Sequence, residues 1–262
     1  MSRMLEALKS LETRRNVAPP SEPAPGQPTL SVLDKLIESY DEPAAEQVLA
    51  APSISSDSPI ARKSFDCCSL PTVAAVPACY LELAQRVGEQ LASNYCNVLL
   101  FVTANHAAAA CFSATQLAQA FVLQSGGRVL LVDGDLRFGR LSKTVCPTGA
   151  GMTEAMLGAA SWPEVIRPTT APRIDFVPSG NSQIPTFERA DFGWGALRPK
   201  YRVVLIGAGD AQEPETRWLA SRCDGVYLVI SRRLTRRQAA SVAVNDLRAG
   251  GANVLGCVVA DD

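Results

Sequence analysis

The hydrophobic positions between residues 97 and 260 form short continuous runs, separated by stretches with helical spacing. Runs such as 98–102 and 129–132 are typical of buried parallel strands, because helices cover both faces of such a strand. The stretches between them place apolar residues three and four positions apart, as amphipathic helices do. Together these patterns predict strands at 97–102, 128–132, 173–177, 202–206, 225–230 and 253–259, and helices at 112–124, 151–158, 214–222 and 235–249.

The alternation of strands and helices predicts an α/β fold with a mostly parallel sheet and helices on both faces. A further amphipathic helix is expected at 78–93, where apolar residues recur from Tyr80 to Leu91 and lead into the first strand. We therefore expect one α/β domain over residues 76–262.

The chain before this domain has a different composition. Apolar residues from Met1 to Leu11 recur at helical spacing and predict an amphipathic docking helix over residues 1–12. Residues 17–29 contain five prolines, which favours an extended linker. We expect residues 13–75 to be a linker rich in Pro, Ser and Ala, with one or two weak helices. Such a segment cannot bury enough apolar surface to offset chain ordering, so few contacts with the domain are expected.

Composition narrows the classes of partner and location. The 262 residues are 47% hydrophobic, enough for one substantial core, and their 25 basic and 26 acidic residues nearly cancel. No global field favours nucleic acid, so none is expected as a partner. No apolar run approaches the roughly 20 residues of a transmembrane helix, and no signal peptide is recognisable, which predicts a cytoplasmic protein. Eight cysteines without a CxxC pair suit reduced thiols.

Residues 97–121 have the order of a nucleotide-binding strand, loop and helix. A phosphate loop needs glycines that turn backbone N–H groups inward, a lysine for the phosphates and a hydroxyl for Mg²⁺. The stretch that should supply them is Ala107, Ala108, Ala109, Ala110 and Cys111. No lysine lies between Lys63 and Lys143, so no shift of register restores one. The sequence predicts a degenerate phosphate loop at 107–111.

The second predicted strand ends in acidic residues. Asp133 and Asp135 follow its apolar run, with Arg137 two positions later. Carboxylates at the carboxyl ends of parallel strands can hold a metal or polarise an attacking hydroxyl, although a plain Asp-Gly turn gives the same pattern. After the strand at 202–206 the chain continues with Gly207, Ala208 and Gly209, and Asp210 comes three residues too late to stand at that strand end.

Five segments in order are similar to the cytoplasmic catalytic domains of the bacterial tyrosine kinases (BY-kinases) that accompany capsule and exopolysaccharide export. They are 130–141 (apolar run, then Asp-x-Asp-x-Arg), 151–158, 174–180, 223–230 with the following Thr-Arg-Arg-Gln, and 250–256. These kinases belong to the deviant-Walker ATPase group that includes MinD and ParA. The resemblance covers about residues 78–260 and implies a P-loop NTPase-like fold.

Several positions depart from the family's motifs. Its Gly-x-Gly-Lys-Thr corresponds to 107–111, and its Asp-Thr-Pro-Pro to 207–210. Its Glu-x-x-Arg-x-x-Arg helix, used in ring closure, aligns with Ala78, Leu81 and Ala84, which speaks against a ring oligomer. The tyrosine-rich tail is missing as well, because the last tyrosine is Tyr227.

The resemblance implies that an active relative would use ATP and Mg²⁺, with Asp133 and Asp135 as catalytic carboxylates, Asp133 as the metal ligand, and 107–111 and Arg137 on the nucleotide. Because the lysine, the glycines and one aspartate are missing, we expect a catalytically degenerate relative without a cofactor. Its expected role is regulatory or scaffolding, in capsule or exopolysaccharide synthesis and export. The implied partner is a membrane-anchored chain-length-determinant (Wzz-like) protein or another export component, which would bring the chain to the inner membrane.

Two alternatives stay open at this point. One is an active ATP-dependent protein-tyrosine kinase or ATPase with an unusual phosphate loop, completed by a cation from another subunit. The other is a positioning scaffold of the MinD or ParA type, tethered by residues 1–12.

Two smaller features have both a functional and an ordinary interpretation. His106, the single histidine, would contact an anion or be a solvated loop residue. A basic cluster opens the last long helix and would bind phosphate or an acidic partner, or simply be an exposed helix start. It consists of Arg232, Arg233, Arg236 and Arg237.

Overall fold

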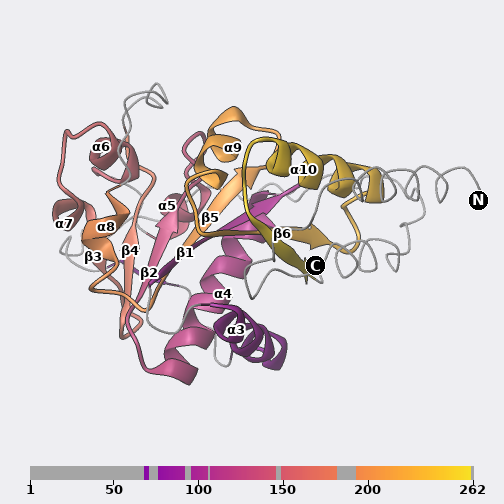
Figure 1. The fold of residues 1–262 in the computed structure, drawn as a ribbon. Coiled ribbons are helices and arrows are strands. Elements are labelled where there is room, and N and C mark those ends of the chain that lie inside the picture. The colour runs from indigo at the N-terminus through magenta and orange to yellow at the C-terminus, as the bar shows by residue number, and fades with distance from the viewer. Residues whose placement is uncertain are drawn as a thin grey trace, which may run out of the picture.

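The computed structural model describes residues 68–70, 76–91, 96–105, 107–145, 149–181 and 193–260. Within these residues a seven-stranded sheet has the order β3-β4-β2-β5-β1-β6-β7, and helices cover both of its faces (Figure 1). The strands are β1 (Asn97–Thr103), β2 (Val129–Asp133), β3 (Arg167–Pro168), β4 (Ile174–Val177), β5 (Val203–Asp210), β6 (Gly225–Ser231) and β7 (Val254–Ala260). The helices are α3 (Ala78–Gln90), α4 (Ala107–Ser125), α5 (Arg140–Val145), α6 (Met152–Met156), α7 (Trp162–Val165), α8 (Trp194–Leu197), α9 (Pro214–Ala220) and α10 (Arg237–Ala249).

All strand pairs are parallel except the pair of β3 with β4 at one edge. Parallel pairing brings the carboxyl ends of β2, β5 and β1 to the same edge of the sheet. The register places Asp133 beside Gly207 and Thr103 beside Asp210. The predicted mostly parallel α/β fold is confirmed.

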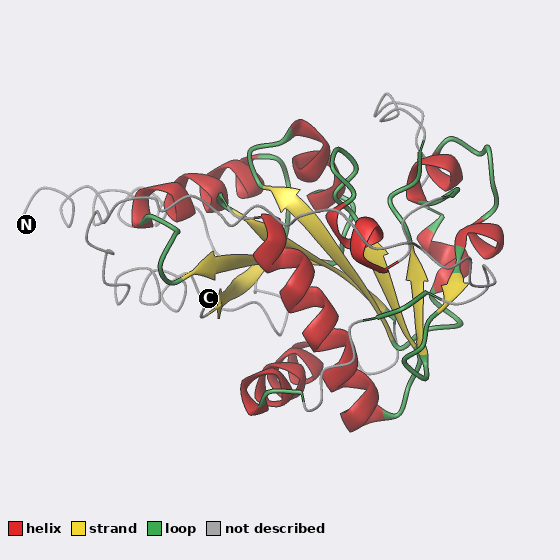
Figure 2. Ribbon diagram, turned by 180° about the vertical axis from the view of Figure 1, so that it is seen from behind, coloured by secondary structure: helices red, strands yellow, loops and turns green. Residues whose placement is uncertain are grey.

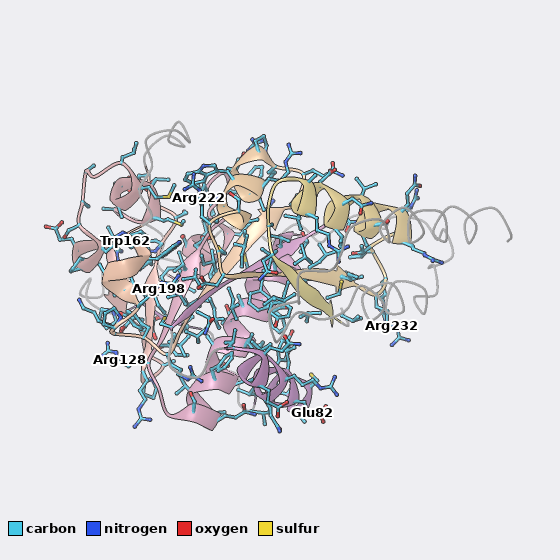
Figure 3. The ribbon with its side chains drawn as sticks, in the orientation of Figure 1. Glu82, Arg128, Trp162, Arg198, Arg222 and Arg232 are labelled. Atoms are coloured by element: carbon cyan, nitrogen blue, oxygen red, sulfur yellow. The ribbon has the colours of Figure 1, made fainter. Side chains whose placement is uncertain are left out.

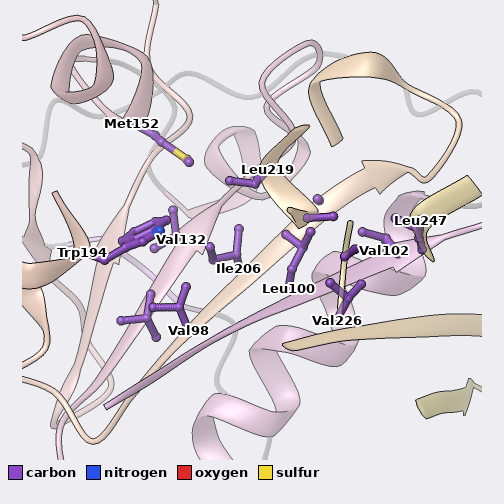
Figure 4. Close-up of a cluster of buried hydrophobic side chains, with 14 of the residues drawn as sticks. Val98, Leu100, Val102, Val132, Met152, Trp194, Ile206, Leu219, Val226 and Leu247 are labelled. Atoms are coloured by element: carbon purple, nitrogen blue, oxygen red, sulfur yellow. The ribbon is translucent and has the colours of Figure 1, made fainter. Parts of the chain in front are cut away.

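Two hydrophobic cores lie on opposite faces of the sheet. Successive strand residues point to opposite faces, so Leu99 and Phe101 pack in one cluster with residues of α3 and α4. Figure 2 shows the face of the sheet that these two helices cover. Val98 and Leu100 pack toward the other face, where Leu219 of α9 completes the cluster with the residues shown in Figure 4. Every residue of β1 is buried, which explains why its sequence is a continuous apolar run.

Several element boundaries differ from those predicted. The helix expected at 112–124 already begins at Ala107, because four consecutive alanines favour helix more strongly than loop. The strand expected to end at 206 continues through Gly207–Asp210. Short elements were also not predicted, namely α5, α7, α8 and β3, since two to six residues are too few to show a periodic pattern.

The prediction of a linker as far as residue 75 is wrong for residues 68–70. Cys68 and Leu70 are only 2% and 4% exposed, and the N–H of Cys68 donates to the carbonyl of Pro168 at 3.0 Å. The N–H of Ser69 donates to the carbonyl of Val145 at 3.1 Å. Two apolar side chains on either side of an exposed serine suffice to attach this segment beside β3. The docking helix expected at 1–12 and the linker from 13 to 67 lie outside the described residues.

None of the helices in the described ranges combines the length and the apolar composition that crossing a membrane requires.

Candidate functional site

Asp133, the last residue of β2, is fully buried and hydrogen-bonded within the chain. Its Oδ2 accepts hydrogen bonds from the backbone N–H and the hydroxyl of Ser142 in α5, both at 2.6 Å. Its Oδ1 accepts the backbone N–H of Asp135 at 3.1 Å. Burial raises the pKa of Asp133 from 3.8 to about 6, and these hydrogen bonds oppose the shift. Local donors of the same chain thus occupy both oxygens of this carboxyl group.

Asp135 is buried as well and forms an ion pair. Its Oδ2 accepts a hydrogen bond from Nη1 of Arg140 at 2.6 Å, and its Oδ1 accepts one from the backbone N–H of Phe138 at 3.1 Å. The guanidinium of Arg140 also lies over the ring of Phe138, with 4.5 Å between the guanidinium carbon and the ring centroid. Asp135 therefore caps the turn that leads into α5 and holds Arg140 in place.

Arg137 forms its ion pair with a different acidic residue, Glu215 of α9. Its Nε donates to Oε1 of Glu215 in α9 at 2.9 Å, and the side chain of Glu215 is only 4% exposed. The family resemblance implies that Arg137 contacts a nucleotide; in the structure its guanidinium compensates a buried glutamate.

The first turn of α4 occupies the stretch predicted as a degenerate phosphate loop. Cys111 lies in this turn, beside the carboxyl ends of β2 and β5. A Cβ atom on Gly207 would lie 3.0 Å from the Cα of Cys111 and 3.5 Å from the Cβ of Ala114. Residue 207 is beside Asp133, where the family resemblance implies an aspartate. The helix thus packs so closely on the sheet here that a side chain at 207 would meet backbone.

The residues around Asp133 do not fit a magnesium-nucleotide complex. Burial, and then the nearby carboxylates of Asp133 and Asp135, raise the pKa of the Cys111 thiol far above its ordinary range. The thiol is therefore protonated at neutral pH, and Mg²⁺ selects oxygen ligands. In the described part of the chain, no three His, Cys, Asp or Glu side chains are grouped as metal ligands. The described residues of α4's first turn carry neither a cation nor a hydroxyl to meet phosphate oxygens.

Several predicted site residues are thus close together, and others are not. Asp133, Asp135 and the 107–111 stretch meet at one sheet edge, as expected from the topology. Asp210 does end β5, contrary to the sequence prediction, but it lies beside Thr103 and accepts the N–H of Gln212 at 2.9 Å. His106 lies outside the described residues.

The basic cluster occupies the connection from β6 to α10, with Arg237 as the first residue of that helix. Arg232, Arg233 and Arg236 are exposed, and Figure 3 shows Arg232 on the opposite side of the view from Arg128. A ligand for the cluster stays a prediction.

The sequence analysis did not identify Ser142 and Arg140, which hold the two carboxylates. Both lie in α5, a helix of 6 residues that shows no periodic pattern. The one available signal is local, because a basic or hydroxyl residue a few positions after Asp-x-Asp can fold back onto it.

Comparison with solved structures identifies the fold. The kinase domain of VpsO superimposes with a TM-score of 0.61 at 19% identity, covering 71% of this chain and 94% of that domain. The kinase domain of the Escherichia coli tyrosine kinase ETK gives a TM-score of 0.58 at 19% identity, covering 69% and 75%. The chain has the fold of these kinase domains. MinD from Pyrococcus horikoshii, in complex with Mg-ADP, shares this fold more distantly, with a TM-score of 0.52 at 19% identity and coverage of 62% and 69%.

No family model matches the chain, and no curated protein sequence is significantly similar to it. The similarity to the solved kinase domains confirms the BY-kinase resemblance of the motifs at the level of the fold. At 19% identity, activity has to be argued from the site itself.

Proposed function

We propose that the protein is a catalytically degenerate relative of the exopolysaccharide-associated bacterial tyrosine kinases, and that it acts as a regulatory or scaffold partner in polysaccharide synthesis or export. The shared fold with the kinase domains of VpsO and ETK supports the relationship. The chemistry of the strand ends supports the loss of activity.

The observation that carries the proposal is the internal pairing of the two carboxylates. Asp133 is held by Ser142 and by the N–H of Asp135, and Asp135 is held by Arg140. Phosphoryl transfer depends on preorganised cations and donors directed at the transferred group. Here the cations and donors near the strand ends are directed at the protein's own carboxylates instead.

The close approach of α4 to β5 gives independent support. A Cβ atom at residue 207 would lie 3.0 Å from the Cα of Cys111, so an aspartate at this position requires α4 to move away from β5. A nucleotide-hydrolysing relative would need both that aspartate and a cation in the loop. The same substitutions argue against the alternative of an active kinase with an unusual loop.

An apolar groove of about 760 Å³ between α3, α4 and the edge strand β7 suits the partner role. Phe112 and Val259 in this groove are 55% and 46% exposed, and Leu83 of α3 lines it too. Apolar side chains gathered in one groove are typical of a docking surface for a helix of another protein. We propose that it receives the cytoplasmic segment of a membrane-anchored chain-length-determinant protein.

The test of lost activity is a phosphorylation assay. The purified chain is incubated with Mg-ATP and a tyrosine-rich acceptor peptide, next to an active bacterial tyrosine kinase as positive control. We expect no phosphotyrosine and no ATP turnover, and no difference between the natural chain and Asp133→Ala. ATP turnover that Asp133→Ala abolishes would instead establish the active-enzyme alternative.

A further inference from the structure

A second polar site lies next to Asp133, whose partner Ser142 is part of its lining. It is a pocket of about 200 Å³ at the carboxyl ends of β2 and β4, between the turn that precedes α5 and the turn that follows β4. Open α/β sheets bind their ligands at this edge, in crevices between loops. The residues of the pocket that matter for the argument are Arg137, Gly139, Ser142, Lys143, Ser179 and Gly180.

The charge of the pocket lining is positive. Among the described residues that line the pocket, Arg137 and Lys143 are the ionisable ones. The hydrogen bond from Arg137 to Glu215 uses Nε, so it does not employ the two terminal nitrogens of the guanidinium. Lys143 is exposed in the last turn of α5, and none of the ion pairs found in the described ranges involves it.

Carboxylates near the pocket are already bonded. Glu215 holds Arg137 at 2.9 Å. Glu154 accepts the backbone N–H groups of Gly151 and Asn181 at 2.7 and 3.0 Å. Asp133 lies behind Ser142 and is shielded by it. Glu215 pairs the charge of Arg137 and orients its guanidinium, so Lys143 supplies the unpaired positive charge among the described residues of the pocket lining.

Two serines bring the two turns of the pocket together. The Oγ atoms of Ser142 and Ser179 lie 3.2 Å apart, and the N–H of Ser179 donates to the Oγ of Ser142 at 2.8 Å. The Ser142 hydroxyl also bonds to Asp133, so these serines fix the shape of the pocket between the two cations. Gly139 has φ 55°, and a Cβ there would lie 2.7 Å from the Ser179 Oγ, so only glycine lets the turn come this close.

We propose that this pocket binds the phosphate group of a phosphate monoester. The terminal guanidinium nitrogens of Arg137, which Glu215 orients through Nε, and the ammonium group of Lys143 match the acceptor oxygens and the charge of a phosphate. Phe138, 43% exposed beside the pocket, offers an apolar surface to the organic part of the ligand. The pocket shares Arg137 with the nucleotide site that the family resemblance implies, but it contains none of the residues of the 107–111 stretch.

The test is a titration of the full chain with inorganic phosphate and with phenyl phosphate, at low ionic strength, followed by NMR or calorimetry. We expect saturable binding of both, tighter for phenyl phosphate because of Phe138. Lys143→Gln should weaken binding by at least about ten-fold, the effect of losing one charged hydrogen bond, while Lys143→Arg retains it. Lys200→Gln is the matched control, because Lys200 is also an exposed lysine but precedes β5, at the end of the sheet where the parallel strands begin.

Three results would overturn the proposal. They are the absence of saturable binding, equal weakening by Lys143→Gln and Lys200→Gln, and binding of inorganic phosphate without phenyl phosphate. The exposure of Lys143 keeps the variants folded, which circular dichroism checks. A further variant, Phe138→Ala, should remove the preference for phenyl phosphate and leave the affinity for inorganic phosphate unchanged.

Discussion

Asp133 combines burial with three hydrogen-bond donors from its own chain, and these two effects act on its charge in opposite directions. Burial is the larger effect, so the pKa rises from 3.8 to about 6. The folded protein therefore binds a proton at Asp133 more tightly than the unfolded chain does. Asp133 thus holds the loop between β2 and α5 in place through its hydrogen bonds, and ionising this buried carboxyl group lowers the free energy of unfolding.

The raised pKa predicts how stability depends on pH. Between pH 3.8 and about 6 the folded state holds more protons at Asp133 than the unfolded state, so the free energy of unfolding falls as pH rises and is level above this window. At about 1.4 kcal/mol per pKa unit, the contribution is on the order of 3 kcal/mol. Urea unfolding at pH 4 and pH 7 should show this decrease in the natural chain and a smaller one in Asp133→Asn. Equal decreases in both proteins would contradict the assignment.

The close packing around residue 207 favours glycine there over the aspartate that the family resemblance implies. Gly207→Ala should lower the free energy of unfolding by about 1–3 kcal/mol, because the added methyl group meets the backbone of Cys111 in a closely packed core. Gly207→Asp should be worse, since it also buries a charge. The matched control is Gly195→Ala in α8, where no atom lies within 4 Å of the new Cβ. Chemical denaturation compares the two, and a neutral Gly207→Ala would refute the packing argument.

At the scale of elements, the segment 68–70 extends the domain beyond the predicted boundary. Leu70→Ala should cost about 2 kcal/mol or more, because a buried leucine loses its packing beside α5 and β3. Ser69→Ala is the control, since this side chain is exposed. Denaturation curves of the two full-length variants decide the question. If Leu70→Ala were as stable as Ser69→Ala, residues 68–70 would behave as linker after all.

The long elements could be predicted from the sequence, whereas the site depends on short ones. Runs such as 98–102 read as strands because both of their faces are buried. The 107–111 stretch was expected to be a loop from its motif position, although alanine favours helix. The strand was expected to end at residue 206, yet β5 continues through Gly207, where α4 packs closely on the sheet. Tertiary packing decided these cases, and no local pattern encodes it.

The whole molecule presents two surfaces of different chemistry. The carboxyl edge of the sheet is polar and carries the pocket proposed to bind phosphate, while the groove between α3, α4 and β7 is mainly apolar. The nearly balanced overall charge gives neither surface a long-range field, so local contacts determine which partner binds.

The groove predicts a difference between two exposed residues of the same helix. Phe112→Asp should reduce binding of the chain-length-determinant segment by about ten-fold or more, because it places a charge in the apolar groove. Leu123→Asp, at the far end of α4 and 67% exposed, should bind like the natural chain. Co-purification and calorimetry measure this. Equal binding by both variants would contradict the proposal that the segment docks in this groove.

The central claim is that the strand ends no longer hold a nucleotide, and a titration with a fluorescent ATP analogue tests it most directly. Without a lysine, the glycine cradle or an aspartate at 207, most of the charged hydrogen bonds to a triphosphate are missing. We predict no saturable binding at physiological ATP concentrations, with or without Mg²⁺. Saturable binding that requires Mg²⁺ and disappears in Asp133→Ala would contradict the account.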